Sequence, residues 1–264
     1  MTKTEIIERN NIKIMGSGEK TLLLAHGFGC DQNMWRFIIP LLENDYIIVV
    51  FDYTGSGQSN LSYYDEVKYS DLYGYSQDII DICEVLSLTN VSIVGHSVSS
   101  IIGLLAAINA PQYFEKMIMI CPSPCFLNFP PDYIGGFDKE DLEELLASMN
   151  KNYIGWASYL APVVMGAENP EELTSELKES FCSTDPNIAQ KFARATFMSD
   201  HRDSLPMTNV PTLILQSSDD TLASVDVGSY MSENMKNAKL SIVNANGHCL
   251  HMTHPEKVTK LIRD

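Results

Sequence analysis

Short apolar runs alternate with helix-like patterns along most of this chain of 264 residues. Several of the runs are apolar without alternation, which is typical of strands that are covered on both faces. Parallel strands joined by helices give such a sheet. The sequence therefore predicts an α/β fold with a mostly parallel, doubly wound sheet and helices on both faces. The predicted strands are Leu22–Ala25, Tyr46–Phe51, Val91–Val94, Lys116–Ile120, Thr212–Leu215 and Leu240–Val243.

Helix patterns occupy the segments between these predicted strands. The N-terminal segment, residues 5–27, differs, because an Asn-Asn pair and a Gly-Ser-Gly sequence are typical of turns. We expect this segment to form short strands. The predicted helices are Met34–Leu42, Leu72–Leu86, Val98–Asn109, Val225–Met235 and a short last helix from Pro255.

One stretch, from about Pro124 to Arg202, contains four helix patterns in succession and no convincing strand. An all-helical insert in an α/β chain predicts a lid over the ligand-binding edge of the sheet, although an ordinary helical subdomain would give the same pattern. We expect residues 1–123 and 203–264 to form the core and residues 124–202 to form the lid. The four patterns begin at Asp138, at Ile154, with Asn169 as a cap and with Asp185.

The charge balance argues against a nucleic-acid partner. The chain has 34 acidic and 18 basic side chains and a formal net charge of -16. Such a charge repels phosphate backbones, so we expect no nucleic-acid partner.

No run approaches the ~18 apolar residues of a membrane span, and the N-terminus lacks the apolar core of a signal peptide. The six cysteines have no zinc-ligand spacing. We expect a cytoplasmic protein without a membrane contact, metal or cofactor.

A serine stands at the junction between a predicted strand and a predicted helix. Residues 94–100 read VGHSVSS, in which Ser97 follows the strand and Val98 begins the helix. A nucleophile elbow needs small residues two places before and after the serine, where strand and helix approach closely. Gly95 and Ser99 are both small. The motif alone is weak, but its position predicts Ser97 as a nucleophile.

A serine hydroxyl needs a base, and a histidine on a late loop could supply it. His248 follows the last predicted strand and Gly247, which permits a sharp turn. The pattern favours His248. We expect His251 and His254 to cap or pack the last helix, and His96 to point away from the nucleophile.

The acid that orients this base should follow the preceding strand. The sequence SSDD offers Asp219 and Asp220, and the pattern alone leaves both open. The residue that faces His248 would hold its ring in the right tautomer. Its neighbour could belong to a polar turn that caps the next helix.

The sequence HGFG after the first core strand is a candidate oxyanion hole. In this arrangement the donors are the backbone N–H groups of Phe28 and Val98. Losing one such donor typically costs ~3 kcal/mol of transition-state stabilisation. A plain glycine turn would explain HGFG if it stood alone.

The features together resemble the α/β-hydrolase superfamily across the full length of the chain. Within it, the sequence resembles RsbQ-like stress-response regulators and is also similar to plant karrikin and strigolactone receptor hydrolases. The resemblance implies an α/β-hydrolase fold with a four-helix lid. It is carried by HGFGCDQNMW, DYTGSGQS, GHSVS, PSPCFLN, KNYIGWA, FCSTDP, SDHR and GHCLHMTHP.

The resemblance also implies which aspartate acts. In the family the catalytic aspartate stands four residues before a position often held by proline, which maps to Asp220 here, with Ser224 in place of the proline. Ser97, His248, Phe28 and Val98 match directly. The chain is therefore expected to be a serine hydrolase acting on ester-type bonds.

The resemblance implies a regulatory role. RsbQ-type proteins bind or slowly hydrolyse a small hydrophobic compound and activate a PAS-domain Ser/Thr phosphatase in the general-stress sigma-factor (sigma-B) response. The alternatives are a general carboxylesterase and a non-catalytic small-molecule receptor. Aromatic residues of the insert could line an apolar pocket, and the candidates are Phe126, Phe129, Phe137, Trp156 and Phe197.

Overall fold

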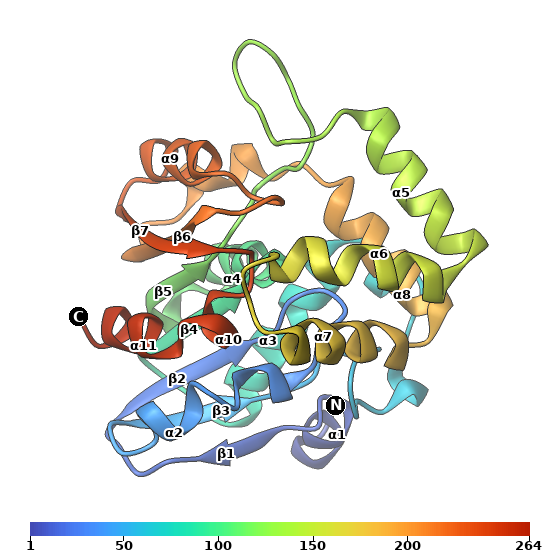
Figure 1. Cartoon of the computed structure of the whole chain (residues 1–264). Helices are drawn as coiled ribbons and strands as arrows, with labels where there is room; N and C mark the ends of the chain where they lie inside the picture. The colour runs from blue at the N-terminus through green and yellow to red at the C-terminus, as the bar shows by residue number, and fades with distance from the viewer.

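The computed structural model describes residues 1–264 and has a seven-stranded central sheet. The strand order is β1-β3-β2-β4-β5-β6-β7 (Figure 1). Only β1 is antiparallel to its neighbour, and the other pairs are parallel. The predicted mostly parallel α/β sheet is confirmed. The strands are β1 Lys13–Met15, β2 Lys20–Ala25, β3 Tyr46–Val50, β4 Val91–His96, β5 Phe114–Ile120, β6 Thr212–Asp219 and β7 Ala238–Asn246.

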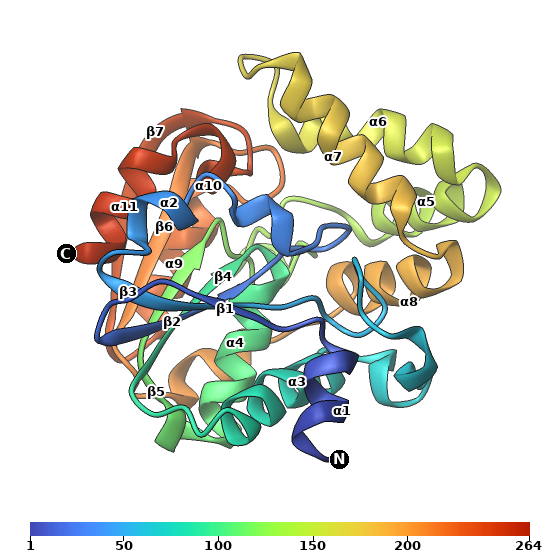
Figure 2. The same ribbon diagram turned by 90° about the horizontal axis from the view of Figure 1, so that it is seen from below.

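Helices cover both faces of the sheet. Figure 2 shows α2, α10 and α11 on one side of the strands and α3 and α4 on the other. The helices are α1 Lys3–Arg9, α2 Ile39–Leu42, α3 Leu72–Val85, α4 Val98–Asn109, α5 Lys139–Lys151, α6 Tyr153–Met165, α7 Glu171–Ser183, α8 Pro186–Phe197, α9 Val225–Asn234, α10 Leu250–Thr253 and α11 Pro255–Arg263.

The sheet divides the apolar side chains into two cores because successive side chains of a strand point to opposite faces. On β2, Leu22 and Leu24 belong to the core that includes α2 and α11, and Leu23 and Ala25 belong to the core that includes α3, α4 and α9. This two-sided burial explains why the strand sequences are apolar without alternation.

The four helices α5 to α8 form an insert, called the lid below, that follows β5 and precedes β6. They stand to one side of the sheet in Figure 2. Their apolar faces are continuous with the core under α2, to which Leu142 of α5, Trp156 of α6 and Phe181 of α7 all belong. The exact limits of the lid, residues 124–202, stay a prediction.

The N-terminal segment corrects one expectation. Residues Lys3–Arg9 form a helix instead of a strand. Thr2 and Glu5 form a capping box, in which each side chain accepts a hydrogen bond from the backbone of the other. The pattern Thr-x-x-Glu is therefore the sequence signal that starts this helix. The predicted helix Met34–Leu42 is also divided, into a 3-10 turn at Gln32–Trp35 and the short α2.

The start of α7 differs in detail from the expectation. Pro170 occupies the N-cap position without a capping hydrogen bond, and Asn169 instead donates from its side chain to the carbonyls of Met165 and Asn246. Asn169 thus connects the lid to the end of β7.

No helix of this chain combines the length and apolar character needed to cross a membrane.

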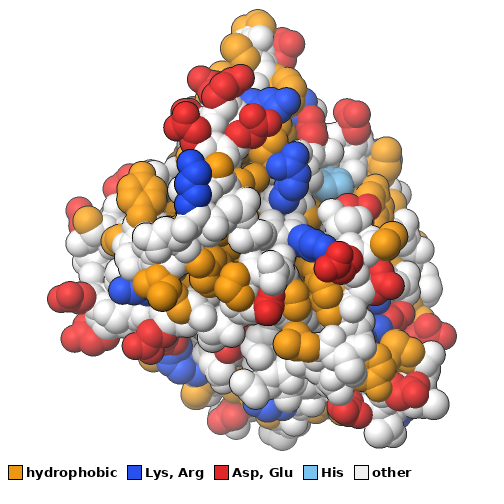
Figure 3. Space-filling model, turned by 90° about the vertical axis from the view of Figure 1, so that its right-hand side faces the viewer, with side chains coloured by type: hydrophobic (Ala, Val, Ile, Leu, Met, Phe, Trp, Pro, Cys, Tyr) orange, Lys and Arg blue, Asp and Glu red, His pale blue; other side chains and the backbone are white.

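The lid-side face of the molecule carries charges of both signs. Figure 3 shows acidic side chains spread over this face, with fewer basic ones and scattered apolar patches between them. This view contains no continuous basic stripe of the kind that follows a nucleic-acid backbone.

Candidate active site

Ser97 occupies a sharp turn between β4 and α4. Its backbone has φ 54 and ψ -122, a conformation that a residue with a side chain rarely adopts. Such strain concentrates at functional sites. The Ser97 N–H donates to the carbonyl of Ile120 on the neighbouring strand at 2.8 Å, which holds the turn in place. The hydroxyl itself makes no hydrogen bond to another group of the chain.

Gly95 and Ser99, the two small residues around Ser97, have different structural roles. A Cβ at Gly95 would lie 2.5 Å from the carbonyl oxygen of Ser99, so only glycine fits there. Ser99 is fully buried, and its hydroxyl donates to the carbonyl of His26. A glycine at that position could not make this bond. Ser99 thereby connects the serine turn to the HGFG loop.

His248 and Asp220 form a buried pair at the ends of β7 and β6. Nδ1 of His248 lies 2.7 Å from Oδ2 of Asp220, and both side chains are almost fully buried. Because the carboxylate accepts, Nδ1 carries the proton, and Nε2 is left without a partner. The unpaired Nε2 is the atom that could accept a proton from a serine.

The hydrogen bonds around Asp220 keep it ionised. Burial favours the neutral carboxyl, but His248 and the N–H groups of Leu222 and Ala223 outweigh that effect and hold the pKa of Asp220 below its usual value. Asp219 is different, because it is exposed and accepts from the side chain of Asn246. The structure therefore brings Asp220, and not Asp219, to His248.

Two backbone N–H groups lie free near the serine turn. Val98 is the first residue of α4, so its N–H has no acceptor within the helix. The N–H of Phe28, in the HGFG loop, donates to no carbonyl of the chain. Free donors at such positions are what an oxyanion hole requires.

Ser97 and His248 line the same small cavity beneath the lid. Its volume is about 30 Å³, space for roughly one water molecule. The remaining walls are mainly apolar and come from the HGFG loop, the lid and the acid loop. They include Phe28, Cys30, Leu160, Val164, Leu177, Phe181, Thr196, Phe197, Leu222 and Cys249.

A larger apolar groove adjoins this cavity. It has a volume of about 490 Å³ and lies between α5, α6 and the acid loop. Leu160, Phe197 and Leu222 line both spaces. These three side chains therefore form the wall between the outer groove and the cavity that contains Ser97.

Only Phe197 of the five predicted pocket aromatics lines the cavity. Phe126 packs behind Phe197, with ring centroids 5.2 Å apart, and Trp156 packs behind Phe28 at 6.1 Å. Phe137 lines the outer groove. The prediction is wrong for Phe129, which is 40% exposed and lies under the guanidinium of Arg202.

The sequence did not predict most of the apolar side chains that line the cavity. Leu160 and Val164 are four residues apart on α6, and Leu177 and Phe181 are four apart on α7. This spacing puts each pair on one face of its helix. The same spacing is common to every packed helix, so the sequence could not distinguish cavity-lining residues from ordinary core.

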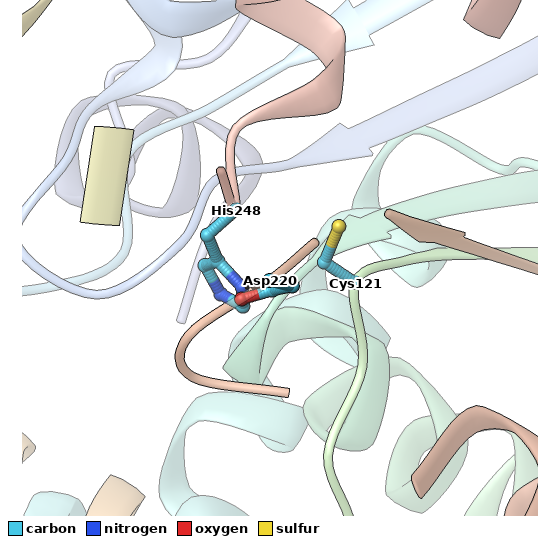
Figure 4. Close-up of side chains that lie close together, drawn as sticks. All are labelled: Cys121, Asp220 and His248. Carbon is cyan, nitrogen blue, oxygen red and sulfur yellow. Dashed lines mark hydrogen bonds and ion pairs between the residues drawn. The ribbon is translucent and has the colours of Figure 1, made fainter. Parts of the chain in front are cut away.

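One group of side chains could hold a metal ion. Cys121, Asp220 and His248 bring a sulfur, a carboxylate oxygen and a ring nitrogen within 4.8 Å of one another (Figure 4). Burial, followed by the charge of Asp220, raises the pKa of the Cys121 thiol well above its ordinary value, whereas metal ligation requires a thiolate. The Nδ1 of His248 is also engaged with Asp220. We therefore assign these atoms to the histidine–carboxylate pair.

The other histidines occupy different surroundings. His96 lines the cavity, and its Nε2 lies 3.0 Å from the carbonyl of His248. The sequence predicts that His96 points away from the nucleophile, whereas its ring borders the same cavity as Ser97. His251 is fully buried and packs against Trp35, with ring centroids 4.6 Å apart. His254 bonds to the hydroxyl of Thr253 next to it.

Known proteins resemble this chain over nearly its whole length. The profile of the alpha/beta hydrolase family matches residues 22–261. The karrikin insensitive 2 receptor CA of Petunia hybrida is 38% identical over 97% of this chain and 94% of its own. The strigolactone esterase D14 of Arabidopsis thaliana is 33% identical over 100% of this chain and 98% of its own.

A solved structure has nearly the same backbone. A hydrolase from Oleispira antarctica superposes with a TM-score of 0.98 and 56% sequence identity, covering 100% of this chain and 96% of that one. The family profile and the relatives together establish the family: the chain belongs to the alpha/beta hydrolases.

Proposed function

We propose that this alpha/beta hydrolase is a serine hydrolase that cleaves ester-type bonds of small, largely apolar compounds. Ser97 is the proposed nucleophile, His248 the general base and Asp220 the acid that orients it. The N–H groups of Phe28 and Val98 are the proposed oxyanion hole. The observation that carries the proposal is the buried His248–Asp220 pair at 2.7 Å, with the free Nε2 of His248 on the cavity that Ser97 also lines.

The first half of the proposed reaction makes an acyl-enzyme. The Ser97 oxygen attacks the ester carbonyl carbon as its proton passes to Nε2 of His248. The carbonyl oxygen becomes an oxyanion and accepts hydrogen bonds from the two N–H groups. When the carbon–oxygen bond breaks, the leaving alkoxide takes the proton from His248 and departs as an alcohol.

The second half restores the enzyme. A water molecule attacks the acyl carbon, and its proton passes to His248. The second tetrahedral intermediate expels Ser97, which recovers the proton, and a carboxylic acid leaves. Asp220 stabilises the imidazolium in both halves without taking a proton.

The size of the cavity bears on the rate. About 30 Å³ does not accommodate a substrate of several heavy atoms, so the wall side chains or the lid helices that carry them must move before the substrate reaches Ser97. Lid movements of this kind limit turnover in many enzymes. We therefore propose slow turnover.

The names of the relatives agree with this proposal. One relative is named a strigolactone esterase and another a karrikin insensitive 2 receptor, and each name refers to a small molecule. For this chain, we propose a small apolar ester or lactone as the ligand class. The apolar walls contributed by Leu160, Val164 and Phe181 support that choice.

Steady-state kinetics on short acyl p-nitrophenyl esters test the proposed function. We expect slow, saturable release of nitrophenol that Ser97→Ala abolishes. Fast turnover on many esters would favour a general carboxylesterase instead. Tight ligand binding, with no turnover above the Ser97→Ala background, would favour a non-catalytic receptor.

The finer role that we propose is regulatory. Ligand binding or slow turnover would activate a PAS-domain Ser/Thr phosphatase in a stress (sigma-B) response, as the resemblance to RsbQ-like regulators implies. The support is that the resembling stretches lie in both core and lid, for example GHSVS and KNYIGWA. A phosphatase assay with a PAS-domain phosphatase tests this role. If the phosphatase activity is the same in the presence and in the absence of this protein, the proposed regulatory role is wrong.

A further inference from the structure

His96, the residue before the proposed nucleophile, touches both loops that flank the cavity. Its side chain is 3% exposed, and Nε2 lies 3.0 Å from the carbonyl oxygen of His248. On its other edge, a Cβ added to Gly27 would lie 2.5 Å from Nδ1, so the ring packs directly against the backbone of the HGFG loop.

The chemistry of these contacts determines the tautomer of His96. A carbonyl oxygen only accepts hydrogen bonds, so Nε2 must carry the proton and donate it to His248. Nδ1 is then bare, and it has no partner in the chain. Burial, with a further contribution from His248, lowers the pKa of His96 to about 3, which keeps the ring neutral.

Three other hydrogen bonds hold the loop that carries His248, one to the lid and two to the consecutive residues Asp219 and Asp220 at the end of β6. The His248 N–H donates to Val164 of the lid at 2.8 Å, its Nδ1 to Asp220, and the preceding Gly247 N–H to Asp219 at 2.8 Å. The bond from His96 is the one that joins the base loop to β4, the strand that ends just before Ser97. Without it, nothing polar would connect His248 to β4.

We propose that His96 is a positioning residue that sets the distance between the base His248 and the serine turn. The Nε2–H bond fixes the backbone of His248 relative to β4, while the ring only packs against the HGFG loop. The ring centroids of His96 and His248 are 5.0 Å apart, so a neutral His96 also avoids repelling the imidazolium that forms during the reaction. The inference rests on the proposed function.

Two substitutions separate the hydrogen bond from the packing. His96→Gln keeps an N–H donor at about the same reach, whereas His96→Phe keeps an aromatic ring and removes the donor. We expect His96→Phe to lower kcat on a short p-nitrophenyl ester by about 10- to 100-fold with KM within about twofold. We expect His96→Gln to keep kcat within about threefold.

A role in packing alone predicts the reverse order, with His96→Phe active and His96→Gln impaired, and that result would overturn the proposal. If wild type shows no turnover that depends on Ser97, the proposed function fails first. If wild type turns over the ester and His96→Phe has the same kcat, the inference about His96 fails while the proposed function stands.

Nuclear magnetic resonance of histidine rings in the unmutated protein tests the geometry even if a variant does not fold. We expect His96 as the Nε2–H tautomer. His26 is a built-in control of the opposite tautomer, because its Nε2 accepts from the N–H of Tyr53 at 3.1 Å and its Nδ1 lies 2.9 Å from the carbonyl of Gly27. A proton on Nδ1 of His96 would overturn the proposal.

Discussion

Asp220 accepts a hydrogen bond from His248 across 2.7 Å, and both side chains are shielded from solvent by the lid and the sheet. The adjacent Asp219 faces outward and bonds to Asn246. Two consecutive carboxylates therefore have different surroundings. The difference arises because β6 ends at Asp219 and the chain turns at Asp220, whose second oxygen accepts from the N–H groups of Leu222 and Ala223.

This difference predicts opposite outcomes for two matched substitutions. Asp220→Asn removes the charge that stabilises the imidazolium and permits the wrong tautomer, so kcat should fall by about 10⁴-fold. Asp219→Asn changes only an exposed contact, so kcat should stay within about threefold of wild type. Kinetics on one short ester check both. An equal loss in the two variants would contradict the assignment of Asp220.

The shared wall between groove and cavity predicts a change in substrate size. Leu160→Ala should open the wall, and kcat/KM for longer acyl chains should rise by about tenfold relative to acetate. The cost to the free energy of unfolding should be ~2–5 kcal/mol. Leu145→Ala is the matched control, because Leu145 lines the groove without reaching the cavity. An unchanged chain-length profile in Leu160→Ala would argue against entry through this wall.

His251 predicts an effect of pH on stability. Both of its ring nitrogens are buried without partners, and burial, followed by His96 and His248, holds its pKa well below the ordinary value. An unfolded histidine binds a proton below about pH 6.5, whereas His251 in the fold does not, so this residue lowers stability as pH falls. His251→Leu removes that penalty.

We expect His251→Leu to be more stable than wild type by ~1–3 kcal/mol at neutral pH, with a gap that widens by up to ~1.4 kcal/mol per pH unit below about pH 6.5. Urea unfolding at two pH values measures this gap. His254→Leu is the control and should change it less, because His254 is partly exposed and bonds to Thr253. A gap that narrows in acid would be the contrary result.

Much of the core could be predicted from sequence because its strands are buried on both faces. The apolar runs around Leu22 and Ile47 have no alternation, as expected of strands that are buried on both faces. The helix at Lys3–Arg9 differs from the prediction because the turn residues that follow it favour short strands, whereas the capping pair Thr2 and Glu5 starts a helix. A short helix has little periodicity to reveal it.

Part of the candidate site could likewise be predicted from the sequence, and part could not. Ser97 and His248 follow strands, so their positions along the chain indicate a common edge of the sheet. The pattern alone leaves Asp219 and Asp220 open, because one residue of turn geometry decides which carboxylate faces inward, and only the resemblance favours Asp220. The contact of His96 with the carbonyl of His248 joins residues that are far apart in sequence. No local pattern encodes such a contact.

Labelling with a fluorophosphonate, read by intact-protein mass and peptide mapping, tests the central claim most directly. A serine activated by His248 should form one covalent adduct, located at Ser97. His248→Ala should slow the labelling by at least about 100-fold, and His254→Ala should leave it unchanged. No adduct at Ser97 in the folded wild-type protein, or equal labelling of wild type and His248→Ala, would contradict the account.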